Sequence, residues 1–189
     1  MGYANVSRPM GFKLLRQQGK ANAAPIPRPL PAVRTPSGGG NASRDLAIGD
    51  AYAIDVNGNA FRAGPNDTVR GIVIGFRFVA VSTIMSGAGP VSEDYSANGA
   101  VDTIIGIESG IEFFEVQADT FAASNIGGKF NLADAAPDST LSQSRQTINV
   151  SGGAGTQFQA EDILPSLADN AYGTNARIYV RLLQTFGSL

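Results

Sequence analysis

The chain contains no cysteine, no histidine and no tryptophan. Without cysteine it can form neither a disulfide framework nor a thiolate nucleophile. Without histidine it lacks the commonest general base and the commonest metal ligand, and a Ser-His-Asp triad cannot be built. These absences leave few routes to catalysis, so we expect that the protein is not an enzyme.

Long apolar runs are also missing. No stretch approaches the roughly 20 apolar residues that a membrane-spanning helix needs. The basic N-terminus offers only Phe12-Lys-Leu-Leu-Arg16 as an apolar stretch, which is too short for a signal peptide, and no small-residue cleavage site closes it. We therefore expect a soluble protein with no membrane partner that is not secreted by that route.

The first 44 residues contain no acidic residue. They hold seven of the fourteen cations and six of the ten prolines. Proline occupies every second position of residues 25–31, and each ring removes a backbone donor, which closes helix and sheet interiors to this run. Residues 37–41 (Ser-Gly-Gly-Gly-Asn) add a flexible joint. We predict an extended basic arm over residues 1–44 that becomes ordered only on another surface, followed by a body over residues 45–189.

Charge divides along the same boundary. The arm carries a formal charge of +7, whereas the body, with seven cations and sixteen acids, carries −9. This split favours contact between the arm and an acidic protein surface, including that of a neighbouring copy of the chain. Nucleic acid would also attract the arm, but the arm has only Tyr3 and Phe12 as stacking platforms. The pattern therefore favours a protein partner over nucleic acid.

Short stretches with strand periodicity, separated by turn signals, fill the body. Residues 51–56 alternate apolar with small or polar side chains, and Asn57-Gly58 is a hairpin signal because both residues tolerate positive φ. The longest stretch, 69–83, is apolar on both faces, as in a strand covered by protein on both sides. We place four residues of this stretch on one face: Ile72, Ile74, Phe76 and Phe78.

Other elements complete the predicted body. In residues 111–118 the alternation slips between Phe113 and Phe114, which predicts a bulge. The remaining predicted strands cover 60–63, 101–107, 129–132, 147–150 and 176–186, with a short helical turn at 121–126 and spaced apolar residues from Phe158 to Leu167. This pattern predicts an all-β fold: a single β-barrel or β-sandwich domain with an extended N-terminal arm.

Candidate catalytic and metal-binding groups are few. Glu108, Glu112 and Glu115 lie close in sequence, but a glycosidase needs two carboxylates that face one cleft, and this spacing does not show that. We interpret them as solvated or interface charges and keep a hydrolase using Glu112 or Glu115 as a weaker alternative. The acidic pairs at 93–94 and 161–162 lack a calcium-loop pattern, and the glycine runs lack the phosphate-loop lysine. We expect no cofactor and no metal.

Several short motifs occur in a recognisable order. Residues 4–11 read Ala-Asn-Val-Ser-Arg-Pro-Met-Gly, residues 48–50 read Ile-Gly-Asp, and residues 71–75 read Gly-Ile-Val-Ile-Gly. Residues 114–119 read Phe-Glu-Val-Gln-Ala-Asp, followed by Ile126-Gly127 and by Asn-Ala-Arg-Ile-Tyr-Val-Arg at 175–181. Together they resemble the small head decoration, or cement, proteins of tailed bacteriophages, from which the proline-rich stretch 25–36 departs.

The resemblance implies structural work on the capsid exterior of a virion. Proteins of that family bind the assembled shell at junctions between subunits of the major capsid protein, often as trimers, and hold it against internal DNA pressure. We therefore expect a homotrimeric cement protein, with deletion of residues 1–40 leaving the body folded but unable to decorate capsids. The alternative is a carbohydrate- or receptor-binding β module on a virion. We predict that six arm cations contact the acidic shell surface: Arg8, Lys13, Arg16, Lys20, Arg28 and Arg34.

Overall fold

The computed structural model describes most of the body and parts of the N-terminal region. The described residues are 5, 7, 9–15, 26–29, 46–56, 58–78, 91–92, 95–96, 102–108, 112–138, 143–164 and 170–183. For residues 26–29, 77–78, 91–92, 95–96 and 102–103 only the backbone is described.

Strands make up nearly all of the regular structure, as predicted. Within the described residues they are β1 (Lys13–Leu15), β2 (Ile26–Pro29), β3 (Leu46–Ala47), β4 (Ala51–Ile54), β5 (Ala60–Arg62), β6 (Gly71–Phe78), β7 (Val91–Ser92), β8 (Tyr95–Ser96), β9 (Asp102–Ile107), β10 (Phe113–Gln117), β11 (Thr120–Phe121), β12 (Lys129–Ala133), β13 (Thr147–Asn149), β14 (Phe158–Ile163), β15 (Gly173–Thr174) and β16 (Arg177–Leu182), with one 3-10 turn, η1 (Ala123–Asn125).

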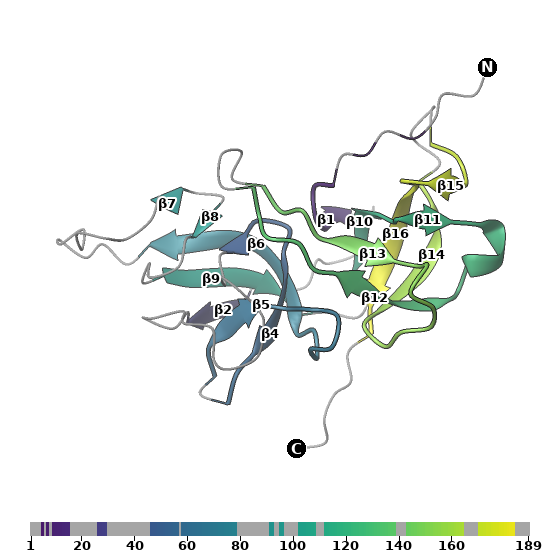
Figure 1. Ribbon diagram of the computed structural model, residues 1–189. Helices are drawn as coiled ribbons and strands as arrows, with labels where there is room; N and C mark the ends of the chain where they lie inside the picture. The colour runs from purple at the N-terminus through teal and green to yellow at the C-terminus, as the bar shows by residue number, and fades with distance from the viewer. Residues whose placement is uncertain are drawn as a thin grey trace.

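Two antiparallel sheets form the bulk of the molecule. One has the strand order β2-β9-β6-β4-β5 and the other the order β1-β10-β16-β14-β12-β13. They lie side by side in Figure 1, the five-stranded sheet on the left and the six-stranded sheet on the right. Two small sheets accompany them: the two-stranded sheet β11-β15 and the three-stranded sheet β3-β8-β7.

The six-stranded sheet curls back on itself. Beyond the end of β10, Ala118 forms a parallel bridge with Ile148 of β13, and the N–H of Asp119 donates to the carbonyl of Ile148 over 3.0 Å. The chain just after β10, a strand near one end of the sheet, thus meets β13, the strand at the other end. This sheet therefore has the character of a small barrel, and closure of this kind hides edge groups that would otherwise need partners.

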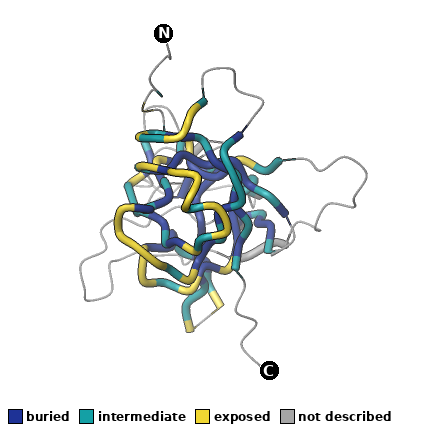
Figure 2. Tube along the Cα trace, turned by 90° about the vertical axis from the view of Figure 1, so that its right-hand side faces the viewer, coloured by how far each residue is buried: buried dark blue, intermediate teal, exposed yellow. Residues whose placement is uncertain are grey.

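One continuous hydrophobic core joins the two sheets. It draws Ile72 and Ile107 from the five-stranded sheet, and Phe114, Phe158 and Ile178 from the six-stranded sheet. Figure 2 shows the buried residues gathered in the middle of the molecule, with exposed turns around them. A core shared in this way makes the described body a single packing unit.

Strand β6 is covered on both faces, as predicted, but the assignment of its faces was partly wrong. Ile72 and Ile74 pack in the shared core, whereas Val73 belongs to a second cluster with Leu46 and Ile104. The register against β9 shifts between Val73 and Gly75. This bulge moves Phe76 to the second cluster, because one extra residue exchanges the faces of all that follow.

The bulge predicted between Phe113 and Phe114 does not exist. Strand β10 pairs without interruption from Phe113 to Gln117 with β16. Phe114 points into the core, and Phe113 lies on the opposite face, where its ring meets Tyr179 edge-on with centroids 5.8 Å apart. The two adjacent phenylalanines therefore need no bulge, because Phe113 has an aromatic partner outside the core.

Part of the predicted arm belongs to the body, which corrects the boundary at residue 44. Phe12 is only 3% exposed and lies in the core, where its ring stacks on Phe158 with centroids 4.6 Å apart. Strand β1 follows directly and pairs with β10. The prediction that residues 1–44 gain structure only on another surface is therefore wrong for residues 9–15, and the expectation that the body tolerates deletion of residues 1–40 is not supported.

The proline-rich run also joins a sheet, as an edge strand. Strand β2 pairs antiparallel with β9, and Pro27 and Pro29 stand opposite Ile105 and Thr103. Successive N–H groups of a strand point to opposite sides, so prolines at alternate positions lose donors on one side only. The side formed by Ile26 and Arg28 remains able to pair with β9. Proline excludes this run from a sheet interior but not from an edge.

We predict that Phe12→Ala lowers the free energy of unfolding by about 3–5 kcal/mol, because it removes a buried ring from the core and leaves a cavity. The matched control is Lys13→Ala, one residue further along, whose side chain is exposed and whose loss should change stability by less than about 0.5 kcal/mol. Urea unfolding of both variants measures the difference. Equal stabilities would contradict the assignment of Phe12 to the core.

Candidate functional site

The six predicted contact residues are only partly within the described structure. Lys13 is exposed on β1, at the edge of the six-stranded sheet. Arg28 lies on β2, of which the backbone alone is described. The other four, Arg8, Arg16, Lys20 and Arg34, fall outside the described residues. The structure therefore brings Lys13 and the backbone of Arg28 to the edges of two different sheets.

Lys13 borders a sheet face that carries charged and aromatic side chains. Along β10 and β16 every second residue points into the core, so the intervening residues lie on the opposite surface. We call this surface the outer sheet face. It comprises Lys13, Phe113, Glu115, Arg177, Tyr179 and Arg181, with Gln159 and Glu161 of β14. Lys13, Glu115 and Arg177 line one shallow depression on it.

Ion pairs fix the side chains of the outer sheet face. Arg177 Nη1 donates to Glu115 Oε1 over 2.5 Å. Arg181 Nε lies 2.8 Å from Glu161 Oε1, a close ion pair without a well-aligned hydrogen bond, while its Nη2 donates to Gln159 over 3.1 Å. Arginines held in this way keep a defined geometry and need less ordering when a partner binds.

Two of the three glutamates in the segment 108–115 bind different partners, namely Glu108 and Glu115. Glu108 accepts from the hydroxyl of Tyr52 over 2.7 Å and pairs with Arg70 over 3.1 Å. Glu115 pairs with Arg177 on the outer sheet face. Glu108 and Glu115 therefore have different partners. Their side chains are only 4% and 11% exposed, so the interpretation as solvated charges is wrong for these two residues. The interpretation as interface charges stays a prediction.

The most buried polar cluster joins the N-terminal region to both sheets. Asp50 is fully buried and accepts from Ser144 Oγ over 2.5 Å and from the N–H of Ala47 over 2.8 Å. Next to it, the N–H of Phe12 donates to the carbonyl of Gly49 over 2.8 Å. Gly11 has φ of +66°, and a Cβ there would collide with Ser144. Only glycine fits this position without strain.

Gln146 and an ion pair extend the cluster across the sheets. Gln146 is fully buried, accepts from the N–H of Ala51 over 2.6 Å and donates to the carbonyl of Ala63 over 2.8 Å. Arg62 Nε donates to Asp134 Oδ1 over 2.9 Å, with 6% of the arginine side chain exposed. These contacts tie β4 and β5 to the segments around β12 and β13.

Burial raises the pKa of Asp50 to about 7, because the interior disfavours the charged carboxylate. Hydrogen bonds from Ser144 and Ala47 and the charge of Arg62 oppose this effect, and the charge of Asp134 adds to it. A neutral Asp50 can donate to Ser144 Oγ while still accepting from Ala47, so the protonated form satisfies both neighbours. Near neutral pH the cluster holds both forms of the carboxyl group.

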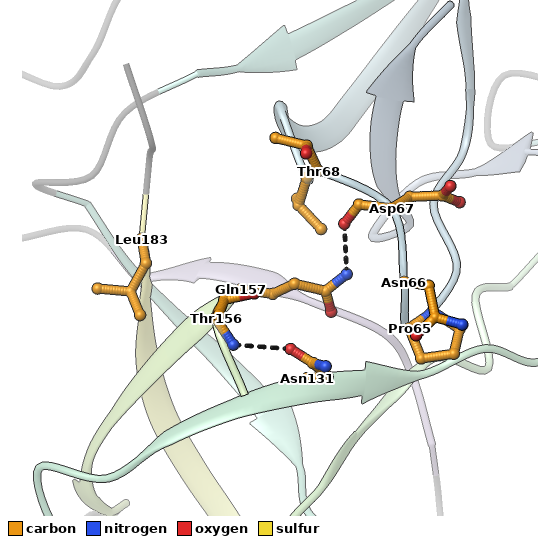
Figure 3. Close-up of a pocket in the computed structure, with 9 residues that line it drawn as sticks. Pro65, Asn66, Asp67, Thr68, Asn131, Thr156, Gln157 and Leu183 are labelled. Carbon is orange, nitrogen blue, oxygen red and sulfur yellow. Dashed lines mark hydrogen bonds between the residues drawn. The ribbon is translucent and has the colours of Figure 1, made fainter. Parts of the chain in front are cut away.

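A polar cleft lies where the two sheets meet on another side of the body (Figure 3). It has a volume of about 250 Å³ and is lined by Pro65, Asn66, Asp67, Thr68, Val69, Asn131, Thr156, Gln157 and Leu183. The amide of Gln157 points to the turn before β6 and donates to the carbonyls of Gly64 and Asp67 over 2.9 and 2.7 Å. Asp67 is the one carboxylate in this lining, so the cleft does not provide the pair that a glycosidase uses.

No aromatic side chain of the residues that the structure describes lines this cleft. Among the described residues no group of three or more acidic side chains is placed to hold a metal ion. The described part of the chain also has no helix that is long and apolar enough to cross a membrane.

Sequence reasoning missed the contacts that hold the N-terminal region in place. Asn5 donates to the carbonyls of Ala171 and Thr174 over 2.8 and 3.0 Å and accepts from the N–H of Ala171 over 3.2 Å. No local sequence pattern predicts these partners, because they lie more than 160 residues away in the chain. The lack of acidic residues and the prolines of this region predicted an extended arm instead.

Comparison of the chain with protein-family models, with curated proteins and with solved structures finds no match.

We predict that the free energy of unfolding falls as pH rises from about 4 to about 7, and that Asp50→Asn removes this dependence. The pKa of Asp50 is raised from 3.8 to about 7 on folding, so the folded state binds the proton more tightly. The stabilisation is complete below the unfolded pKa and is lost as pH passes through the folded pKa. At about 1.4 kcal/mol per pH unit the loss is on the order of 4 kcal/mol. Urea titrations between pH 4 and 8 measure it.

Asp119→Asn is the control of opposite sign. Partial burial acts to raise the pKa of Asp119, but hydrogen bonds from Ser151 Oγ and the N–H groups of Val150, Thr120 and Ser151 outweigh it and lower the pKa. Its stabilisation is therefore present above its unfolded pKa and lost at more acidic pH. If the free energy of unfolding of the wild type and of Asp50→Asn changed in parallel between pH 4 and 7, the raised pKa of Asp50 would be contradicted.

Proposed function

We propose that this protein is a non-enzymatic structural component of a phage virion, which binds the outer surface of the capsid and holds neighbouring shell subunits together. The observation that supports the proposal is the position of Lys13, the described cation of β1, at the edge of the outer sheet face. Lys13 stands at the edge of that face, opposite Glu115, which pairs with Arg177. The same face carries Phe113, Tyr179 and Arg181. Arginine and aromatic side chains are enriched where proteins bind one another.

The charge distribution supports the same function. Seven cations and no acids in the first 44 residues suit an acidic shell surface, which would attract them over about one Debye length. Many copies on a symmetric lattice add to the effect, because each copy that binds two shell subunits links them. The resemblance to decoration proteins points to the same partner, the major capsid protein.

The structure changes how the arm would act. Arg16 and Lys20 lie in the connection between β1 and β2, and both of these strands are paired with the body. A connection fixed at both ends gives up less conformational freedom on binding than a free tail. The proposed contact is therefore made by a basic segment that joins two paired strands, and not by a free arm that folds on docking.

We predict that replacing six cations by glutamine weakens binding to capsids that lack this protein by at least roughly ten-fold. The change covers Arg8, Lys13, Arg16, Lys20, Arg28 and Arg34. A ten-fold effect corresponds to about 1.4 kcal/mol in total, which six weak exposed contacts can supply. Co-sedimentation with capsids at several salt concentrations measures it, and added salt should weaken the wild type more than the variant.

The matched control replaces Lys129 and Arg145, two exposed cations of the body, by glutamine. It should bind capsids as the wild type does. Unchanged binding by the six-fold variant, with its fold intact by circular dichroism, would contradict the role of the basic region. Binding of capsids by neither protein, together with binding of a glycan, would favour the carbohydrate-binding alternative.

A further inference from the structure

Strand β2 is the terminal strand of the five-stranded sheet, and its described backbone pairs with β9 along one edge. Its four residues pair with β9 from Ile26 opposite Gly106 to Pro29 opposite Thr103. Backbone pairing of this kind does not depend on which copy of the chain supplies the strand, because main-chain groups are the same in each. Short segments that add to the edge of a sheet are a common mode of recognition between chains.

The connections on either side of β2 are much longer than its own pairing requires. Residues 16–25 separate it from β1, and residues 30–45 separate it from β3. Connections within a compact domain usually have about 4–6 residues. At about 3.3 Å per residue these segments can span up to roughly 30 and 50 Å, comparable to the diameter of a small domain. The strand can therefore reach β9 of an adjacent copy.

Charge favours exchange of the strand over its return to the same body. Without residues 16–44 each copy has nine cations and sixteen acids, a formal charge of −7, and two such bodies repel each other. The segment 16–44 holds five cations and no acids, so it carries +5. An arm that crosses to a second body lies between two acidic surfaces and offsets the repulsion between them. An arm that stays on its own body leaves less positive charge at the junction between copies.

We propose that β2 is exchanged between copies of this chain, so that Ile26–Pro29 of one copy completes the five-stranded sheet of the next by pairing with its β9. Exchange of an identical element needs no new contact surface and is a low-cost route to an oligomer. The partner is a second copy of the chain, and the contact is the edge of β9. This inference does not depend on binding to a capsid.

Cysteine cross-linking tests the exchange, because the natural chain has no cysteine. Pro27 stands opposite Ile105. A proline cannot take part in a hydrogen-bonded pair, so this is a non-hydrogen-bonded pair, for which Cα atoms lie about 4.5 Å apart, within disulfide range. The full-length Pro27→Cys/Ile105→Cys variant is purified under reducing conditions, oxidised at low micromolar concentration and analysed by denaturing gel and peptide mass spectrometry.

Exchange predicts that most chains with a 27–105 disulfide run at twice the monomer mass or more. In addition, Pro27→Cys co-expressed with Ile105→Cys should give a hetero-disulfide between the two chains. The control Arg28→Cys/Ile105→Cys should cross-link far less, because residue 28 stands opposite Ile104 and points to the other face of the sheet. Circular dichroism and size-exclusion chromatography under reducing conditions confirm that each variant keeps its fold.

Two results would overturn the exchange. In the first, the 27–105 disulfide forms but the chains run at monomer mass, which shows pairing within one copy. In the second, no 27–105 disulfide forms although the variant is folded, which shows that β2 does not occupy the edge of β9. Capsid binding is not used in this experiment, so its outcome is separate from that of the proposed function.

Discussion

The fold depends on a small set of buried hydrogen bonds between segments that are far apart in the sequence. Gln146 connects Ala51 with Ala63, and Gln157 connects Leu132 with the turn at Gly64. Apolar side chains could pack the two sheets in several registers, whereas each amide accepts only one arrangement without leaving a buried polar atom unpaired. The cluster around Asp50 adds the N-terminal region to this arrangement through Phe12 and Gly49. Phe12 thereby fixes the start of β1, and with it Lys13, on the body.

The strands that could be predicted are those with regular alternation and clear turns. The hairpin of β4 and β5, and strands β9, β12 and β13, lie close to their predicted positions. Strand β14 was not predicted, because its register shifts between Ala160 and Asp162 and this bulge disrupts the alternation. The cation at residue 13 was a predicted contact, but the face beside it was not foreseen, since it arises only when β10 and β16 pair. Long-range partners such as those of Gln146 leave no local pattern.

The motifs that resemble decoration proteins contain residues with structural tasks in this chain. Asn5 holds the loop at Ala171, Gly11 passes Ser144, and Asp50 is the buried carboxylate. Gly71 leaves room for the hydroxyl of Tyr52, and Asn175 adopts a positive φ of 58°. Such residues are required by backbone conformation and packing. The motifs therefore indicate an architecture more directly than they indicate a binding partner, and the partner must be argued from charge and surface.

The alternating prolines of β2 have a consequence for solutions in which this protein is concentrated. The side of β2 that faces away from β9 lacks the amide hydrogens of Pro27 and Pro29, so a further strand cannot build a regular ladder there. A fibril grows when further strands add to a sheet edge, and each added strand needs a row of backbone donors and acceptors there. The same run of residues that completes the sheet thus also terminates it, and crowding many copies together should yield discrete particles and no polymer growing from this edge.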